Sequence, residues 1–287
     1  MYATVRDTRL YFDVEGMGLV PDGDRMAEHP VAFVIHGGPG GDHTGFKPAF
    51  SPLARRMQLV YFDHRGQGRS AAGDPEKYTL DENVEDMEAL RRHLGLGAIV
   101  SIGTSYGGMV AMAHAARYPA SVSHLVLIVT AAHKGLMERS RAIVAERGSD
   151  EQRRVVAMLY RGELDTVEKL RHYYDVMGPM YSHRHDAAAA AKARQRGILT
   201  PIALNRAFAP GGWMHHYDIR AELAAITAPT LILAGRHDWI CPPEFSEEIH
   251  RLIPGSDLRI FEHSSHSIRA DEPAAMLDAI AGFVVYR

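Results

Sequence analysis

The chain has 287 residues, of which 46% are hydrophobic and 23% are charged, with a formal net charge of -3, one cysteine and seventeen histidines. This length fits one large α/β domain or two small ones, and the apolar fraction excludes wholesale disorder. A single cysteine excludes an internal disulfide and a cysteine-rich metal site, and the near-neutral charge leaves no electrostatic footprint for nucleic acid. Without an apolar run of ~20 residues or a signal-peptide core at the start, we expect no membrane partner and a cytoplasmic location.

The first part of the chain predicts strands. Residues 3–15 alternate loosely and turn near Asp7, which indicates a β-hairpin, whereas the Gly-, Pro- and acid-rich residues 16–30 predict a loop. Short apolar runs then recur along the chain, each bounded by glycine or polar residues, as is typical of strands buried on both faces of a parallel sheet. The six runs are residues 31–35, 58–62, 98–102, 124–129, 230–234 and 257–261.

Helical patterns lie between these runs. Thr79-Leu-Asp-Glu82 is a capping box that opens a helix reaching about residue 94, and an alanine-rich helix is expected over residues 109–118. Further helices are expected to begin at Pro242-Pro243 and at Pro273. Strands that alternate with helices indicate βαβ crossovers, so the predicted fold class is α/β, with a mostly parallel, doubly wound sheet.

One segment interrupts this alternation. Residues 132–217 contain no convincing strand and many helix formers, including an alanine-rich helix with Asp186 as its N-cap and Gly197 as its C′ residue. We interpret residues 132–217 as a helical lid inserted after the fourth strand. Residues 1–131 and 218–287 then form the core.

Three polar residues at predicted strand ends suggest chemistry. Gly103-Thr-Ser105-Tyr-Gly107 fits the G-x-S-x-G pattern of a nucleophile elbow and stands between a strand and a helix, although alone it can equally be a glycine-rich turn. Asp238 follows the fifth strand and His266 the sixth, which gives the order Ser, acid, His at one sheet edge. We therefore predict Ser105 as the nucleophile, His266 as its base and Asp238 as the orienting acid.

Other residues compete for these roles. His263 is a rival base, and His237 and Glu262 are rival acids. His266 is preferred because it stands among small serines and lies further beyond the strand end.

The loop His36-Gly-Gly-Pro-Gly40 follows the first buried strand. Backbone N–H groups in such a loop can stabilise an oxyanion together with the N–H of the residue after the nucleophile. This nominates Gly38 and Tyr106 as oxyanion donors. The glycines can also serve a turn that needs positive φ, and the two interpretations are compatible.

Taken together, these motifs resemble the α/β-hydrolase fold, and more narrowly its proline iminopeptidase-like branch. The resemblance covers residues 3–130 and 218–287. Besides the segments already quoted, it rests on Asp63-His-Arg-Gly-Gln-Gly-Arg-Ser70, and on Gly235-Arg-His-Asp238. It implies the same roles for Ser105, Asp238, His266, Gly38 and Tyr106.

The chain also departs from that branch. The branch commonly has Gly-Gly-Ser-Trp-Gly around its nucleophile, whereas this chain has Thr104 and Tyr106 beside Ser105. Its aminopeptidases hold the substrate ammonium with acidic residues of the cap, and no cap motif is matched here. The acidic candidates, each of which can instead belong to a solvated helix face, are Glu138, Glu146, Glu163, Asp165 and Asp175.

Three further patterns in the sequence resemble binding or pocket motifs. Residues 66–71 match G-x-G-x-x-A, but a dinucleotide site also needs a helix directly after them, so we assign them and Arg65 to a structural loop. The histidine pairs His183/His185 and His215/His216 lack metal-ligand spacing, so no metal and no cofactor is expected. Trp213 and Met214 are candidates to line an acyl pocket, or simply to pack the lid against the core.

The predicted function is hydrolysis of a small-molecule or short-peptide amide or ester through an acyl-enzyme, as in the proline iminopeptidase-like aminopeptidases. A carboxylesterase or lactonase with the same triad is the alternative. A cofactor-free oxygenase and a non-catalytic ligand receptor on this fold are further alternatives. The substrate and the oligomeric state stay open.

Overall fold

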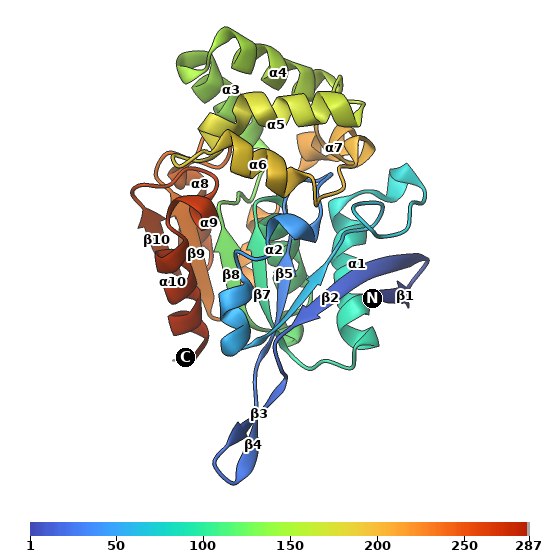
Figure 1. Cartoon of the computed structure of the whole chain (residues 1–287), viewed down its shortest axis with the longest axis vertical. Helices are drawn as coiled ribbons and strands as arrows, with labels where there is room; N and C mark the ends of the chain where they lie inside the picture. The colour runs from blue at the N-terminus through green and yellow to red at the C-terminus, as the bar shows by residue number, and fades with distance from the viewer. Residues whose placement is uncertain (286–287) are drawn as a thin grey trace.

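The computed structural model describes residues 1–285, and its centre is an eight-stranded sheet in the order β1-β2-β6-β5-β7-β8-β9-β10 (Figure 1). β1 and β2 form the predicted N-terminal hairpin, β2 pairs antiparallel with β6, and all pairings from β6 to β10 are parallel. The mostly parallel sheet predicted from the sequence is thus confirmed. Its strands are β1 (Tyr2–Val5), β2 (Thr8–Glu15), β5 (Val31–Ile35), β6 (Gln58–Phe62), β7 (Ile99–Thr104), β8 (Val122–Ile128), β9 (Thr230–Gly235) and β10 (Asp257–Phe261).

Most of the parallel strands are covered on both faces, which explains why they read as continuous apolar runs. In β5, Phe33 and Ile35 join one apolar cluster, whereas Ala32 and Val34 join the other, because side chains alternate along a strand. Among the α-helices outside residues 132–217, three contribute to the first cluster and two to the second. They are α1 (Leu80–His93), α2 (Tyr106–Arg117) and α8 (Pro243–Leu252), and then α9 (Ile268–Asp271) and α10 (Pro273–Val285).

The structure confirms one predicted helix end and differs from the prediction at two others. Thr79 Oγ1 accepts the N–H of Glu82, so the predicted N-cap of α1 is present. α2 begins at Tyr106, three residues before the predicted start, because the turn at Ser105 leads directly into the helix. The prediction that Gly197 is the C′ residue of the alanine-rich helix is wrong, since that helix has its C-cap at Gln195.

The loop predicted for residues 16–30 is also wrong. It contains β3 (Leu19–Asp22) and β4 (Arg25–Glu28), which pair antiparallel as a separate hairpin that projects from the molecule (Figure 1). Its two-residue turn has Gly23 at φ +65°, which glycine supplies without steric cost. The turn-forming composition of this segment predicts a loop. Neither strand has the regular apolar–polar alternation that would have indicated a strand.

Five α-helices lie between β8 and β9 in the chain, within residues 132–217, the segment that we call the lid. They gather at the end of the molecule opposite the β3–β4 hairpin (Figure 1). These helices are α3 (Gly135–Arg147), α4 (Asp150–Arg161), α5 (Val167–Tyr181), α6 (Ala187–Arg194) and α7 (Pro201–Phe208). Over residues 1–285, no helix is both long and apolar enough to cross a membrane.

Candidate active site

Ser105 occupies the sharp turn between β7 and α2, with φ 55° and ψ -121°. This left-handed backbone is unfavourable for a residue with a Cβ, so the surroundings must hold it. Its N–H donates to the Ile128 carbonyl at 2.8 Å, and its own carbonyl accepts from Thr130 Oγ1 and from the Gly108 N–H, both at 2.8 Å. Hydrogen bonds to β8, to Thr130 just after that strand and to α2 therefore hold the elbow in this conformation.

The two flanking glycines allow the elbow to pack this tightly. A Cβ at Gly103 would lie 2.3 Å from the carbonyl oxygen of Gly107, and a Cβ at Gly107 would lie 2.2 Å from that of Ile35. Both distances are far inside van der Waals contact, so α2 can approach β7 and β5 only without side chains at these positions. This is the physical reason for the G-x-S-x-G spacing.

The structure brings together the three residues that were predicted to react. His266 Nε2 lies 3.0 Å from Ser105 Oγ, and His266 Nδ1 lies 2.8 Å from Asp238 Oδ2. Asp238 is buried, and its Oδ1 accepts the backbone N–H groups of Ile240 at 2.8 Å and Cys241 at 3.0 Å. Because both carboxylate oxygens are engaged, Asp238 holds the imidazole in one orientation.

The rival residues lie elsewhere. His263 is exposed, the ring of His237 packs against that of His183 at 4.5 Å, and Glu262 pairs with Arg236 at 2.7 Å on the surface. None of these side chains contacts Ser105 through a hydrogen bond in the described part of the chain. Of the candidates, His266 and Asp238, which the sequence already favoured, are the two linked to Ser105 by hydrogen bonds among the described residues.

The predicted oxyanion donors stand beside Ser105. Tyr106 is the first residue of α2, so its N–H has no acceptor within the helix. Gly38 has φ +129°, and its neighbour Gly37 lies so close that a Cβ there would be 3.2 Å from Ser105 Cβ. Gly37, Gly38 and Ser105 line the same cavity, so N–H groups of this loop are available to an oxyanion in it.

Two buried side chains hold the loop of residues 36–40 in place. His36 Nδ1 donates to the Gly37 carbonyl at 2.8 Å, and its Nε2 accepts the His64 N–H at 3.1 Å, an arrangement that requires a neutral ring. Burial lowers the pKa of His36, which favours that neutral form. Gln67 Oε1 accepts the N–H of Gly40 at 2.7 Å. The loop of residues 63–70 thereby braces the loop of residues 36–40.

Arg65 has a structural position, as the sequence suggested. Its guanidinium donates two hydrogen bonds to Asp86 of α1, at 2.7 and 2.8 Å, and pairs with Asp7 at 2.8 Å. The adjoining residues 66–71 lead to a short 3-10 helix, Pro75–Lys77, rather than to the long helix that a dinucleotide site requires.

A cavity of about 520 Å³ extends from Ser105 and His266 towards the lid. This volume is in the range of small-molecule sites. Its wall is mainly apolar and includes seven Phe, Tyr and Trp side chains. The aromatic lining residues are Phe46, Tyr160, Tyr173, Tyr174, Tyr181, Phe208 and Trp239.

Tyr181 and Asp271 shape this site, and sequence reasoning missed both. The Tyr181 ring meets His266 edge-on, with 5.7 Å between centroids, and the Tyr181 carbonyl accepts the Ser267 N–H at 2.9 Å. Asp271 Oδ1 accepts from Ser182 Oγ at 2.6 Å. These contacts fasten the end of α5 to the loop that carries His266. Neither residue stands in a motif, so the sequence contained no signal for them.

The two residues nominated for an acyl pocket separate in the structure. Met214 lines the cavity. Trp213 does not line it, and its ring packs instead against Tyr106 at 5.6 Å and Tyr217 at 6.3 Å. Trp213 thus connects the lid to α2. This is the packing role that the sequence analysis gave as the alternative to a place in the acyl pocket.

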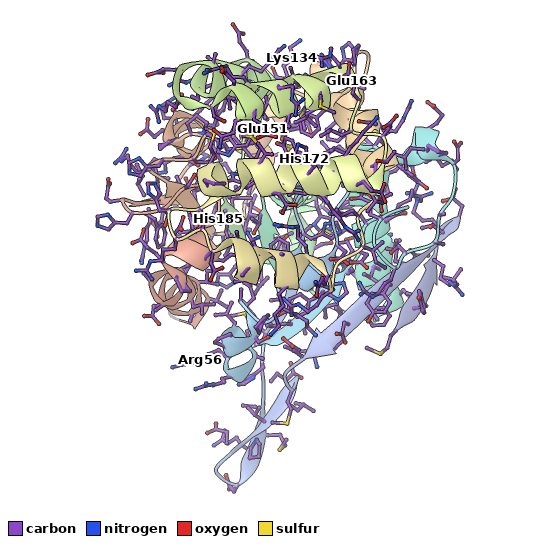
Figure 2. The ribbon with its side chains drawn as sticks, turned by 45° about the horizontal axis from the view of Figure 1, so that its top comes forward. Arg56, Lys134, Glu151, Glu163, His172 and His185 are labelled. Atoms are coloured by element: carbon purple, nitrogen blue, oxygen red, sulfur yellow. The ribbon has the colours of Figure 1, made fainter. Side chains whose placement is uncertain are left out.

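The five acidic lid candidates for an ammonium site all lie outside the cavity lining among the described residues. Glu163, which is labelled near the top of Figure 2, pairs with Arg161 at the end of α4. Asp165 pairs with Lys169, and Asp175 pairs with an arginine of α6. These carboxylates are engaged at the surface.

Two other carboxylates line the cavity, and both already have partners. Asp42 pairs with Arg69 at 2.8 Å and also accepts the Ile198 N–H at 2.9 Å. Asp186 Oδ1 accepts the Ala189 N–H at 3.0 Å and so caps α6. A substrate ammonium would have to compete for these groups.

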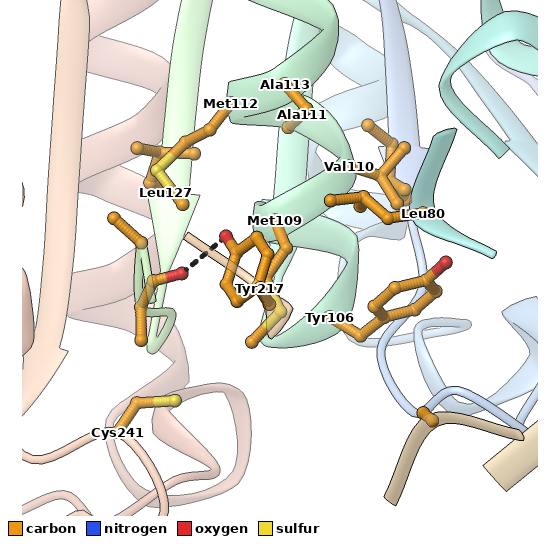
Figure 3. Close-up of a cluster of buried hydrophobic side chains, with 14 of the residues drawn as sticks. Leu80, Tyr106, Met109, Val110, Ala111, Met112, Ala113, Leu127, Tyr217 and Cys241 are labelled. Carbon is orange, nitrogen blue, oxygen red and sulfur yellow. Dashed lines mark hydrogen bonds between the residues drawn. The ribbon is translucent and has the colours of Figure 1, made fainter. Parts of the chain in front are cut away.

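Cys241, the one cysteine of the chain, lines the same cavity and is buried near Tyr217 (Figure 3). The Tyr217 hydroxyl donates to the Ala131 carbonyl at 2.9 Å. Burial raises the pKa of the Cys241 thiol well above its usual value, and the nearby Asp238 raises it further. In residues 1–285, no three His, Cys, Asp or Glu side chains are grouped as a metal site would need.

Comparison with known proteins agrees with this geometry. The family model of the alpha/beta hydrolase fold matches residues 30–273. The chain belongs to the α/β-hydrolase fold family. It is proline iminopeptidase-like, since a proline iminopeptidase of Pestalotiopsis fici is 31% identical over 249 residues, covering 85% of this chain and 87% of the relative.

Solved structures show the same fold. An alpha/beta fold family hydrolase from Bacillus anthracis superposes with a TM-score of 0.80 at 21% identity, covering 99% of this chain and 98% of that one. The enol-lactonase from Burkholderia xenovorans superposes with a TM-score of 0.72 at 20% identity, covering 99% of both chains. The family match and the 31% identical relative make this protein an α/β-hydrolase enzyme, and the solved structures show its fold.

Proposed function

We propose that this protein is a serine hydrolase that cleaves small esters or lactones through an acyl-enzyme on Ser105. The observation that carries the proposal is the hydrogen-bonded series Ser105–His266–Asp238 opening into a largely aromatic cavity. A nucleophile, a base and an orienting acid in this arrangement are what acyl transfer requires.

The reaction would proceed in two balanced steps. Ser105 Oγ attacks the substrate carbonyl while His266 Nε2 takes its proton, and the N–H groups of Gly38 and Tyr106 stabilise the oxyanion. His266 then protonates the leaving group as the acyl-enzyme forms. In the second step His266 takes a proton from water, which attacks the acyl carbon, and the same proton returns to Ser105. Throughout, Asp238 stabilises the positive imidazolium.

An ester or lactone is favoured over an aminoacyl substrate by the charges around the cavity. An ammonium group transferred from water into an apolar site needs a carboxylate partner. The two carboxylates on the wall, Asp42 and Asp186, are committed to Arg69 and to the α6 N-terminus. An acyl group that carries no ammonium can instead pack against the aromatic side chains without needing a carboxylate partner.

An aminopeptidase is the second candidate, and the 31% identity to a proline iminopeptidase is the observation that favours it. It requires Asp42 or Asp186 to exchange its present partner for the substrate ammonium. A comparison of p-nitrophenyl butyrate and simple lactones with prolyl p-nitroanilide separates the candidates. Faster turnover of the prolyl compound would reverse our preference.

Loss of the nucleophile tests the mechanism itself. We expect Ser105→Ala to lower kcat by roughly 10³-fold or more and to abolish labelling by a fluorophosphonate probe. Ser101→Ala is the matched control, because Ser101 lies in β7 and is buried away from the cavity. Undiminished turnover in Ser105→Ala would contradict the mechanism. An unlabelled wild-type protein would favour a ligand receptor, and oxygen consumption would favour an oxygenase.

A further inference from the structure

Arg269 is a cationic side chain on the cavity wall that has no ion-pair partner among the described residues. Arg269 belongs to α9, three residues after His266, and its side chain is partly buried. Within residues 1–285 its guanidinium makes one hydrogen bond, from Nε to the Gly45 carbonyl at 3.3 Å, and no ion pair. The guanidinium carbon lies 5.1 Å from the centroid of the Phe46 ring, so the group is positioned by stacking.

The nearby charged groups do not neutralise it. Asp271 is on the same helix, but its carboxylate already accepts from Ser182 Oγ, the Arg184 N–H and the Ser265 N–H. Burial lowers the pKa of Arg269, and Tyr181 and Asp271 only partly oppose this.

The other charged residues that line the cavity differ from Arg269. Arg194 pairs with Asp175, and the side chain of Arg184 is exposed. Asp42 is held by Arg69, and Asp186 caps α6. Arg269 is thus the cation that combines a place on the cavity wall, partial burial and an unused pair of terminal nitrogens among the described residues.

We propose that Arg269 binds a carboxylate of the substrate, so that the preferred substrates are small esters or lactones that carry a carboxylate group. This inference rests on the proposed hydrolase function and names its substrate class. A guanidinium presents its N–H groups in a planar fork that matches a carboxylate with two parallel hydrogen bonds. Contacts with Phe46 and Gly45 hold the guanidinium beside the cavity, and the partly buried setting strengthens the charge pair relative to water.

Matched substrate pairs test the proposal. One pair places the charge on the acyl side, mono-p-nitrophenyl adipate against its primary amide. The other places it on the leaving group, para-carboxyphenyl butyrate against para-carbamoylphenyl butyrate. We expect the wild-type enzyme to prefer the carboxylate of at least one pair by roughly 10- to 100-fold in kcat/KM, the range of a charge-assisted bidentate contact.

Variants assign the preference to Arg269. Arg269→Met keeps an apolar stem over Phe46 and should bring the preference close to one, whereas Arg269→Lys, which keeps the charge without the fork, should retain part of it. Arg259→Met, on the exposed side of β10 and outside the cavity lining, should leave the preference unchanged. As an independent readout, benzoate should inhibit hydrolysis of the neutral ester more strongly than benzamide, and Arg269→Met should remove that difference.

The outcomes separate this inference from the proposed function. Labelling of each variant by the fluorophosphonate probe at the wild-type rate shows that the site is folded. If the labelled wild-type enzyme shows no preference for either carboxylate, or if Arg269→Met retains it, Arg269 does not bind the substrate and the hydrolase proposal stands. If the wild-type protein is neither labelled nor active on any probe, both proposals fall. Should Arg269→Met fail to fold, Arg269→Lys and the benzoate comparison still decide the point.

Discussion

Replacing Asp238 by asparagine probes the proposed site with a change of very few atoms. In the wild-type protein, Oδ1 of Asp238 accepts the N–H groups of Ile240 and Cys241 at 2.8 and 3.0 Å, and Oδ2 faces His266 Nδ1 at 2.8 Å. Asparagine has one acceptor oxygen for these two duties. If the N–H₂ group of the asparagine faced the backbone N–H groups of Ile240 and Cys241, both donors would lack an acceptor, which costs about 1–3 kcal/mol for each. The oxygen will therefore stay on the backbone side, and the amide N–H₂ will face His266.

That orientation reverses the tautomer of the imidazole. His266 Nδ1 must then accept a hydrogen bond, so the ring proton moves to Nε2, which can no longer take the proton of Ser105. We expect kcat for a p-nitrophenyl ester to fall by about 10⁴-fold, equivalent to about 5.5 kcal/mol of transition-state stabilisation. The KM and the free energy of unfolding in urea should change little, because the asparagine still hydrogen-bonds to the two backbone N–H groups and to His266.

The control is Asp278→Asn, which makes the same chemical change on the exposed face of α10 and should leave kcat unaltered. If Asp238→Asn keeps its fold and loses less than tenfold in kcat, the tautomer argument is wrong, and Asp238 does not orient the base.

Three further predictions concern packing, charge and thiol reactivity. Gly107→Ala should lower the free energy of unfolding by about 3 kcal/mol or more, whereas Gly282→Ala, where the added Cβ meets nothing within 4 Å, should raise it by about 0.5–1 kcal/mol in the same urea titration. Burial tends to raise the pKa of Glu88, but hydrogen bonds from Arg91 and its neighbours lower it to about 2, so the ionised form stabilises the fold above its unfolded pKa of 4.5. Glu88→Gln should therefore cost about 3 kcal/mol at neutral pH, and the difference from wild type should shrink as the pH falls from 4.5 towards 2; an equal difference at all pH values would contradict this. Because burial raises its pKa, Cys241 should resist iodoacetamide in the native protein and react in urea, and rapid alkylation of the native form would show that the residue is accessible.

The elements predicted correctly are those with a local cause. Runs such as residues 31–35 and 58–62 are apolar on both faces because helices cover both sides of the sheet, so their bounds could be read directly. The N-cap at Thr79 is equally local, since its hydroxyl needs only the N–H three residues later. The β3–β4 hairpin was missed because it packs against no core and therefore has no regular apolar pattern.

The candidate site also combines features that have a local cause with features that depend on the tertiary structure. Ser105, Asp238 and His266 could be nominated because each stands at the carboxyl end of a parallel strand, and parallel strands bring such ends to one edge. Their hydrogen bonds, and the separation of His266 from its rival His263, required the loops to be placed in space. The acidic lid residues could not be judged from sequence because the pairing of a carboxylate depends on which arginine or lysine lies next to it in space.

The sequence by itself thus determined the parallel sheet, the elbow glycines and the order of the reacting residues, because these depend on periodicity, backbone conformation and strand ends. The tertiary structure alone decided how the lid meets the core. It placed Tyr181 against His266, turned Trp213 away from the cavity and left Arg269 on the wall without a carboxylate. These contacts join segments far apart in the chain. Their energies depend on burial and on opposing charge, which no local pattern encodes.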